Sequence, residues 1–151
     1  MRLHLINLFD TNVFNGNLRI SVSHSFAPRL PLMILVSTPN VDRIILRGSG
    51  DIDMESIDNE RLNLVVEGSG GITARGNSDL LVLRLDGSGD FYLKNLKANR
   101  AKVELNGSGD IEVNVSGALD VKINGAGDVY NYGEATRVTK AISGAGEFIQ
   151  E

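Results

Sequence analysis

The stretch Gly87-Ser88-Gly89-Asp90-Phe91 returns 20 residues later as Gly107-Ser108-Gly109-Asp110-Ile111. Twelve of the 17 glycines fall in six such Gly-x-Gly pairs, which begin at Gly48, Gly68, Gly87, Gly107, Gly125 and Gly144. Successive pairs begin 18 to 20 residues apart. A near-constant period of this length is typical of a solenoid, in which each repeat forms one turn of a stack.

Apolar and polar residues alternate between the glycine pairs. Examples are the runs Leu62, Leu64, Val66, then Leu81, Leu83, Leu85, then Ala101, Val103, Leu105. Such alternation puts one set of side chains inside and the other outside along a strand. An antiparallel up-and-down sheet would alternate too, but it gives no reason for the same bend at every second strand. We therefore predict an all-β protein with a parallel β-helix whose coils hold about 18–20 residues.

The predicted β-helix is a single domain over 1–151. Residues 1–47 are a strand-like leader with the first coils, and 48–151 hold the six repeats. We expect the leader to form first coils or a flanking hairpin, which another subunit could complete. We expect each period to hold two short strands, with a second bend at segments such as Ser116-Gly117-Ala118. At the carboxyl end, Lys140, Asn131 and Gln150 stand at core positions, and polar residues there are typical of a capping repeat.

Composition excludes several classes of protein. The 151 residues contain no cysteine, which excludes disulfides, a thiol nucleophile, thiolate metal sites and a lipidated amino-terminal Cys. Fifteen basic against 19 acidic residues argue against nucleic-acid binding. No apolar run approaches the roughly 20 residues of a membrane-spanning helix, so we predict no membrane insertion. The apolar start is broken by His4 and Asn7, so we expect neither a signal peptide nor a lipobox.

The repeated blocks resemble those of the head GIN domain family of proposed auto-transporter adhesins. The match is carried by Gly48-Ser49-Gly50-Asp51-Ile52, the two blocks quoted above, Val121-Lys122-Ile123-Asn124-Gly125, Leu35–Ile44 and Asn17–Val22. The resemblance runs from about residue 17 to 150. It implies a bacterial, right-handed β-helix of the pectin-lyase type. It also implies adhesion at the cell envelope or outside the cell, with no catalytic set.

Tyrosines and acids supply the candidate ligand-binding residues. Tyr92 and Tyr130 share one outward column with Glu112 between them, and Tyr132 adds a third ring nearby. Flat rings on a polar ladder can stack on sugars or anchor a protein partner. Isolated surface tyrosines, common on β-structure, are the alternative.

An acidic residue follows most glycine pairs, and three of them, Asp90, Asp110 and Asp128, are candidates for a cation site. The favoured alternative is that each carboxylate accepts hydrogen bonds from nearby backbone N–H groups. Acid pairs such as Asp51 with Asp53 are the kind that glycoside hydrolysis uses, but no basic cluster accompanies them. We predict no metal, no cofactor and no enzymatic activity.

Outward aliphatic residues are the candidates for a subunit interface. Ile45 and Val65 share one outward column, and Val82 lies in the neighbouring one. Either the leader or a second copy of the chain covers such side chains. We therefore expect a homo-oligomer with a protein or glycan ligand, serving as a non-enzymatic adhesion scaffold at the envelope or cell surface. The alternatives are a carbohydrate-binding or carbohydrate-active β-helix module, and a cytoplasmic interaction protein.

Overall fold

The computed structural model describes residues 9–22, 33–38 and 40–151, and every regular element in them is a β-strand. The chain divides into two compact units, Met1–Ser37 and Thr38–Glu151. The sequence predicted one β-helix domain over 1–151, whereas the parallel coils lie within the second unit. Parts of the predicted leader, 1–8, 23–32 and 39, lie outside the described residues. The described chain contains no helix with the length and apolarity that crossing a membrane requires.

The first unit contains an antiparallel hairpin. Its strands are β1 (Phe9–Phe14) and β2 (Asn17–Val22), joined by Asn15 and Gly16 at φ 49° and 75°. Two successive residues with positive φ match the twist of the flanking strands, and Asn-Gly is the sequence that best adopts this turn. This turn lies before the first glycine pair at Gly48, so the glycine period did not predict it. This part of the leader is therefore a hairpin and not a parallel coil.

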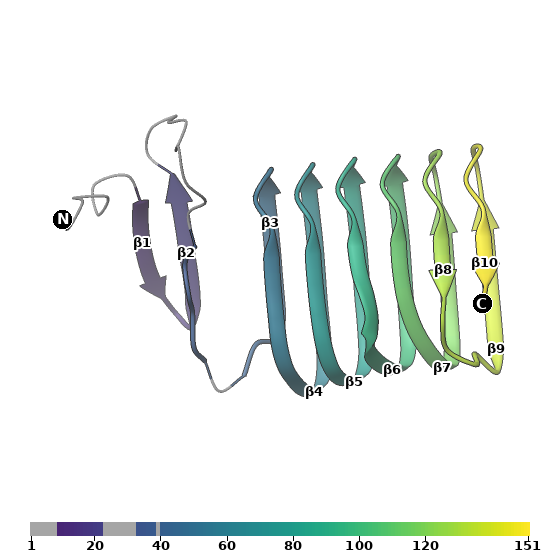
Figure 1. Cartoon of the computed structure of the whole chain (residues 1–151), viewed down its shortest axis with the longest axis horizontal. Helices are drawn as coiled ribbons and strands as arrows, with labels where there is room; N and C mark the ends of the chain where they lie inside the picture. Colours follow the sequence, from purple (N-terminus) through teal and green to yellow (C-terminus); the bar gives the residue numbers. More distant parts are fainter. Residues whose placement is uncertain (1–8, 23–32, 39) are drawn as a thin grey trace. The chain divides into compact units, whose positions relative to one another are not determined.

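The second unit is a stack of parallel coils (Figure 1). Its strands are β3 (Arg43–Gly48), β4 (Ile52–Gly68), β5 (Ile72–Gly87), β6 (Phe91–Gly107), β7 (Ile111–Ile123), β8 (Val129–Asn131), β9 (Arg137–Ile142) and β10 (Phe148–Gln150). The pairing order is β10-β8-β7-β6-β5-β4-β3, and β9 also pairs with β7. These coils, about six turns in all, confirm the predicted all-β, parallel β-helix. The hand of the winding stays a prediction.

The strands of the central coils are longer than the sequence suggested. β4 to β7 run for 13 to 17 residues around each coil instead of dividing into two short strands. Irregular pairing marks the bends within them, as between Met54 and Ile57, where Ser56 has φ 59°. Bulges of this kind bend a strand without ending its ladder.

The Gly-x-Gly bends stack directly on one another. A Cβ on Gly68 would overlap the carbonyl oxygen of Gly48 one coil before, and Gly68 also has φ 141°. At Gly70, a Cβ would overlap the carbonyl oxygen of Gly50. Neither position can hold a larger residue unless the neighbouring coil moves away. The repeat of glycine in the sequence is therefore a consequence of how closely the coils approach.

The inward columns form one continuous core. Its largest fully buried side chains are Phe91, Leu62, Leu64, Ile72, Leu81, Leu83, Leu85, Leu93, Leu96, Leu105, Ile111 and Leu119. They include Leu62, Leu64, Leu81, Leu83, Leu85 and Leu105, which are alternating positions that the sequence placed inside. The outward positions between them carry the polar ladders from which any binding surface must be built.

The carboxyl end of the stack is closed by polar side chains at core positions. Lys140 pairs in register with Val121, and Asn131 with Val113, as the sequence predicted. Asn131 is fully buried, and its amide bonds with the backbone N–H and C=O groups of both Val115 and Gly133. Its Nδ2 also donates to Oε1 of Gln150 at 3.0 Å. These bonds satisfy buried polar groups at a point where the apolar core ends.

Candidate functional site

The predicted tyrosine column exists. Tyr92 pairs in register with Glu112, and Glu112 pairs with Tyr130, so the two rings lie two coils apart, roughly 10 Å. The hydroxyl of Tyr92 donates to Oδ2 of Asp90 at 2.9 Å. Tyr130 makes the equivalent, longer bond to Oδ2 of Asp128 at 3.4 Å. Each ring is therefore held against the acid that precedes it by two residues.

Tyr132 lies in the neighbouring outward column, together with Lys94. The ammonium Nζ of Lys94 stands 3.9 Å from the centroid of the Tyr132 ring, which is a close cation–π contact. The backbone of Lys94 accepts a hydrogen bond from Asn114 Nδ2 at 3.0 Å. We call Tyr92, Glu112, Tyr130 and Tyr132 the tyrosine face. Its rings have fixed orientations before any ligand arrives.

The three phenols of the tyrosine face remain protonated at neutral pH. The hydrogen bond to Asp90, followed by its negative charge, raises the pKa of Tyr92 above its ordinary value. Loss of solvent is the first cause that raises the pKa of Tyr130 and of Tyr132. Tyr92 exposes 48% of its surface, whereas the other two rings are half-buried. The tyrosine face can thus offer neutral rings and hydroxyl groups to a partner.

The acids that follow the glycine pairs form a backbone-binding ladder. Oδ1 of Asp90 accepts a hydrogen bond from the backbone N–H of Asp110 at 2.8 Å, and Oδ1 of Asp110 does the same for Asp128 at 2.9 Å. Asp128 repeats the contact with the N–H of Glu147 at 2.8 Å. These contacts agree with the alternative to a cation site, in which each carboxylate accepts a hydrogen bond from a nearby backbone N–H group. Among the described residues, no group of three or more His, Cys, Asp or Glu side chains is placed to hold a metal ion.

The acid pair Asp51 and Asp53 is divided between two structural contacts. Oδ1 of Asp51 accepts from the N–H of Gly71 at 2.9 Å, while Asp53 pairs with Arg75 at 3.0 Å. Arg75 also reaches Glu55 at 3.1 Å. These contacts use both acids in holding adjacent coils together.

The aliphatic candidates for a subunit interface differ in exposure. Ile45 and Val65 are register partners, as predicted, and Val82 stands beside Asn63 in the next outward column. Ile45 exposes 40% of its surface, Val65 only 9%, and Val82 is half-buried. Ile45 is thus the member of this set that offers the most apolar surface to a second copy.

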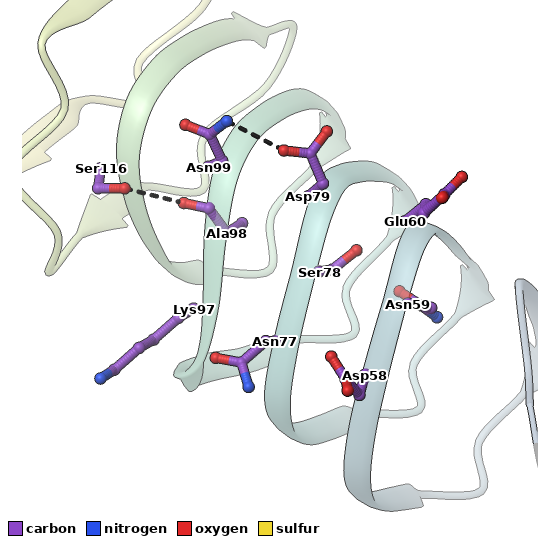
Figure 2. Close-up of a pocket in the computed structure, with 10 residues that line it drawn as sticks. All are labelled: Asp58, Asn59, Glu60, Asn77, Ser78, Asp79, Lys97, Ala98, Asn99 and Ser116. Carbon is purple, nitrogen blue, oxygen red and sulfur yellow. Dashed lines mark hydrogen bonds between the residues drawn. The ribbon is translucent and has the colours of Figure 1, made fainter.

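A polar groove that the sequence pattern did not predict crosses the outer surface of β4, β5 and β6 and reaches β7 (Figure 2). Its volume is about 520 Å³. The ten lining residues are Asp58, Asn59, Glu60, Asn77, Ser78, Asp79, Lys97, Ala98, Asn99 and Ser116. We call this the amide groove. The only signal in the sequence is that residues with short polar side chains recur at these positions in successive repeats, which resembles any solvated strand face.

The register gives the amide groove its shape. Asp58, Asn77 and Lys97 pair with one another along one side. The inward column of Asn59, Ser78 and Ala98 forms the floor, where Ser78 and Ala98 expose only 4% and 3%. The residues that follow these in the chain, Glu60, Asp79 and Asn99, form the other side (Figure 2). The groove therefore runs across the coils, along the axis of the stack.

Hydrogen bonds fix one wall of the amide groove. Asp79 accepts from Asn99 Nδ2 at 3.0 Å and from Arg100 Nη2 at 2.6 Å. The bonds from Asn99 and Arg100 hold the pKa of Asp79 below its usual range, so this carboxylate is charged at neutral pH. On the floor, Asn59 Nδ2 donates to the carbonyl of Val41 at 2.8 Å. In the described part of the chain, Asn59 Oδ1 is the one buried side-chain polar atom without a partner.

Comparison with known proteins adds a family and a fold. Residues 3–135 match the model of a family described as "Putative auto-transporter adhesin, head GIN domain". A crystal structure of a "putative adhesin" from Bacteroides fragilis NCTC 9343 superposes with a TM-score of 0.79 at 22% identity. The superposition covers 97% of this chain and 78% of that one, and it shows the same fold. A search of curated proteins returned no match.

Proposed function

This chain belongs to the head GIN domain family, and we propose that it is a non-enzymatic binding scaffold that works in adhesion at the cell envelope or surface. The observation that carries the proposal is the tyrosine face. Three rings on adjacent outward columns are held in place by Asp90, Asp128 and Lys94. Rings that need no reordering lose little conformational entropy when a partner binds.

The contacts of the acids support a binding role over a catalytic one. Asp53 is paired with Arg75, and Oδ1 of Asp110 and of Asp128 each accepts a hydrogen bond from a backbone N–H group. A glycoside hydrolase needs one carboxyl group held protonated and another free to act on the substrate. These acids hold neighbouring coils together instead. We expect the protein to release no new reducing ends when it is incubated with polysaccharides.

Surface display tests the adhesive role. Cells that display the chain should adhere to protein-coated surfaces and to one another more strongly than cells that display an empty anchor. The triple variant Tyr92→Ala, Tyr130→Ala, Tyr132→Ala should lose this gain at an equal display level. The matched triple Phe variant keeps the rings and should retain most of it. If cells that display the triple Ala variant adhere as strongly as cells that display the wild type, the tyrosine face is not the adhesive surface.

Location is tested separately. Fractionation of cells that produce the native protein should place it in the envelope or the medium. Recovery in the cytosol alone would contradict an adhesive role at the surface and would favour a cytoplasmic interaction protein.

A further inference from the structure

The amide groove has the dimensions of a ligand site. It crosses four coils, which at about 4.8 Å per coil gives a length of roughly 14 Å along the stack. Its volume of about 520 Å³ falls within the range of small-molecule sites. Because it follows the stack axis, an extended ligand lying in it would touch successive coils in turn.

The lining of the amide groove selects for a ligand rich in hydrogen-bonding groups. Nine of its ten lining side chains carry a polar group, and Ala98 is the exception. There is no large aliphatic or aromatic side chain to receive an apolar ligand or a helix. Carboxylates accept, ammonium donates, and amides do both, so the best partner presents groups that can donate and accept. Hydroxyl groups have that property.

Some of the lining groups are committed and others are available. The wall made by Asp79 is locked by Asn99 and Arg100. In contrast, Asp58, Glu60, Asn77 and Lys97 have no hydrogen-bonding or ionic partner among the residues that the structure describes, and all four are exposed. A rigid wall and floor beside available polar groups is the arrangement that a preformed site needs.

The charges along the amide groove nearly balance, which favours a neutral ligand over a strongly charged one. Asp58 and Glu60 place two carboxylates at its first coil, and Lys97 places an ammonium group two coils further on. The charge of Asp79 is offset by Arg100. A polyanion would be repelled by the two carboxylates at the first end, whereas a polycation would meet only one carboxylate in excess and would lie against Lys97. We propose that the amide groove binds a neutral oligosaccharide, laid across the coils along the axis of the stack.

The amide groove and the tyrosine face share no residue, so separate variants test the two proposals. The test uses the purified full chain and a panel of neutral oligosaccharides of glucose, galactose, mannose and N-acetylglucosamine, with sulfated and uronic-acid oligosaccharides as the charged arm. Calorimetric titration should detect binding of at least one neutral member, with little dependence on salt. Binding confined to the charged arm, or to calcium titrated alone, would overturn the proposal, as would no neutral binding at millimolar concentration.

Variants locate the bound sugar. Asn77→Ala and Lys97→Ala each remove an exposed side chain of the groove and should weaken binding about tenfold. Lys102→Ala, another exposed lysine of β6 outside the groove, is the matched control and should bind normally. Circular dichroism checks that all three are folded. If the groove variants bind normally and Tyr92→Ala does not, the sugar lies on the tyrosine face and the proposal fails. If the tyrosine variants lose cell adhesion but still bind sugar in the groove, the result supports the adhesive role of the tyrosine face and leaves the groove proposal standing.

Discussion

The carboxylate oxygen Oδ1 of Asp110 accepts a hydrogen bond from the backbone N–H of Asp128, one coil further along the stack, at 2.9 Å. The same bond joins Asp90 to Asp110 and Asp128 to Glu147. A carboxylate so placed satisfies the N–H group just after the glycine bends that begin at Gly107, Gly125 and Gly144. The acid column thus links neighbouring coils through hydrogen bonds.

Replacing Asp110 should therefore cost stability. We expect Asp110→Ala to lower the free energy of unfolding by about 1 kcal/mol, since one charge-assisted hydrogen bond at an exposed site is lost. Urea denaturation measures the change. Asp120→Ala, an exposed acid of β7 for which no such bond is seen, should stay within about 0.5 kcal/mol of the wild type.

Calcium should not stabilise the protein through this column. Asp90, Asp110 and Asp128 each engage one carboxylate oxygen with the backbone. Cation binding at this column would need several free oxygen ligands at one point. We expect calorimetric titration of the wild type with calcium to give no binding heat. A saturable isotherm that disappears in Asp110→Ala would show that the acids do hold the ion.

The stacked glycines allow a sharply matched pair of variants. Gly89→Ala places a Cβ into the carbonyl oxygen of Gly70, so we expect a loss of about 2–4 kcal/mol or a failure to fold. Gly50 is the equivalent residue of the first coil, where a Cβ meets nothing within 4 Å. Gly50→Ala should be close to neutral. Comparable losses in both variants would mean that local conformation, and not the approach of the coils, demands glycine.

The buried side-chain amide of Asn131 should contribute substantially to the free energy of unfolding. Asn131→Ala leaves groups of Val115, Gly133 and Gln150 without their partner, and we expect a loss of about 2–3 kcal/mol in urea denaturation. Asn63→Ala, on an outward column of β4, is the control and should change stability little. If Asn131→Ala unfolds like the wild type, the polar end of the stack is not a cap.

Stability should fall at high pH through Tyr92. The pKa of its phenol is raised in the folded protein, so the contribution is fully present below the ordinary pKa near 10 and is lost as pH rises through the folded value. We expect urea midpoints to decrease more steeply in this alkaline range for the wild type than for Tyr92→Phe. Identical alkaline profiles would contradict the contact between Tyr92 and Asp90.

Self-association should depend on Ile45. Its outward side chain is 40% exposed beside the nearly buried Val65, so we expect Ile45→Lys to shift an oligomer toward monomer in sedimentation measurements. Thr139→Lys, an exposed residue of β9, is the control. A wild-type chain that stays monomeric well above micromolar concentration would end the expectation of a homo-oligomer.

The sequence by itself determined the coil. The glycine period and the alternation around it favoured a parallel stack, and the alternation placed side chains such as Leu81, Leu83 and Leu85 inside. The register of Tyr92, Glu112 and Tyr130 followed as well, because residues one period apart must lie in the same column. These features are periodic, and a period is visible along the chain.

Only the tertiary structure decided what the columns do. Whether Asp110 faces a cation or an N–H group depends on distances across coils. The amide groove depends on short floor residues, Ser78 and Ala98, lying between two taller polar columns. The near burial of Val65 depends on its neighbours and not on its own identity. Such properties arise where side chains from different repeats meet, and the sequence holds those repeats about twenty residues apart.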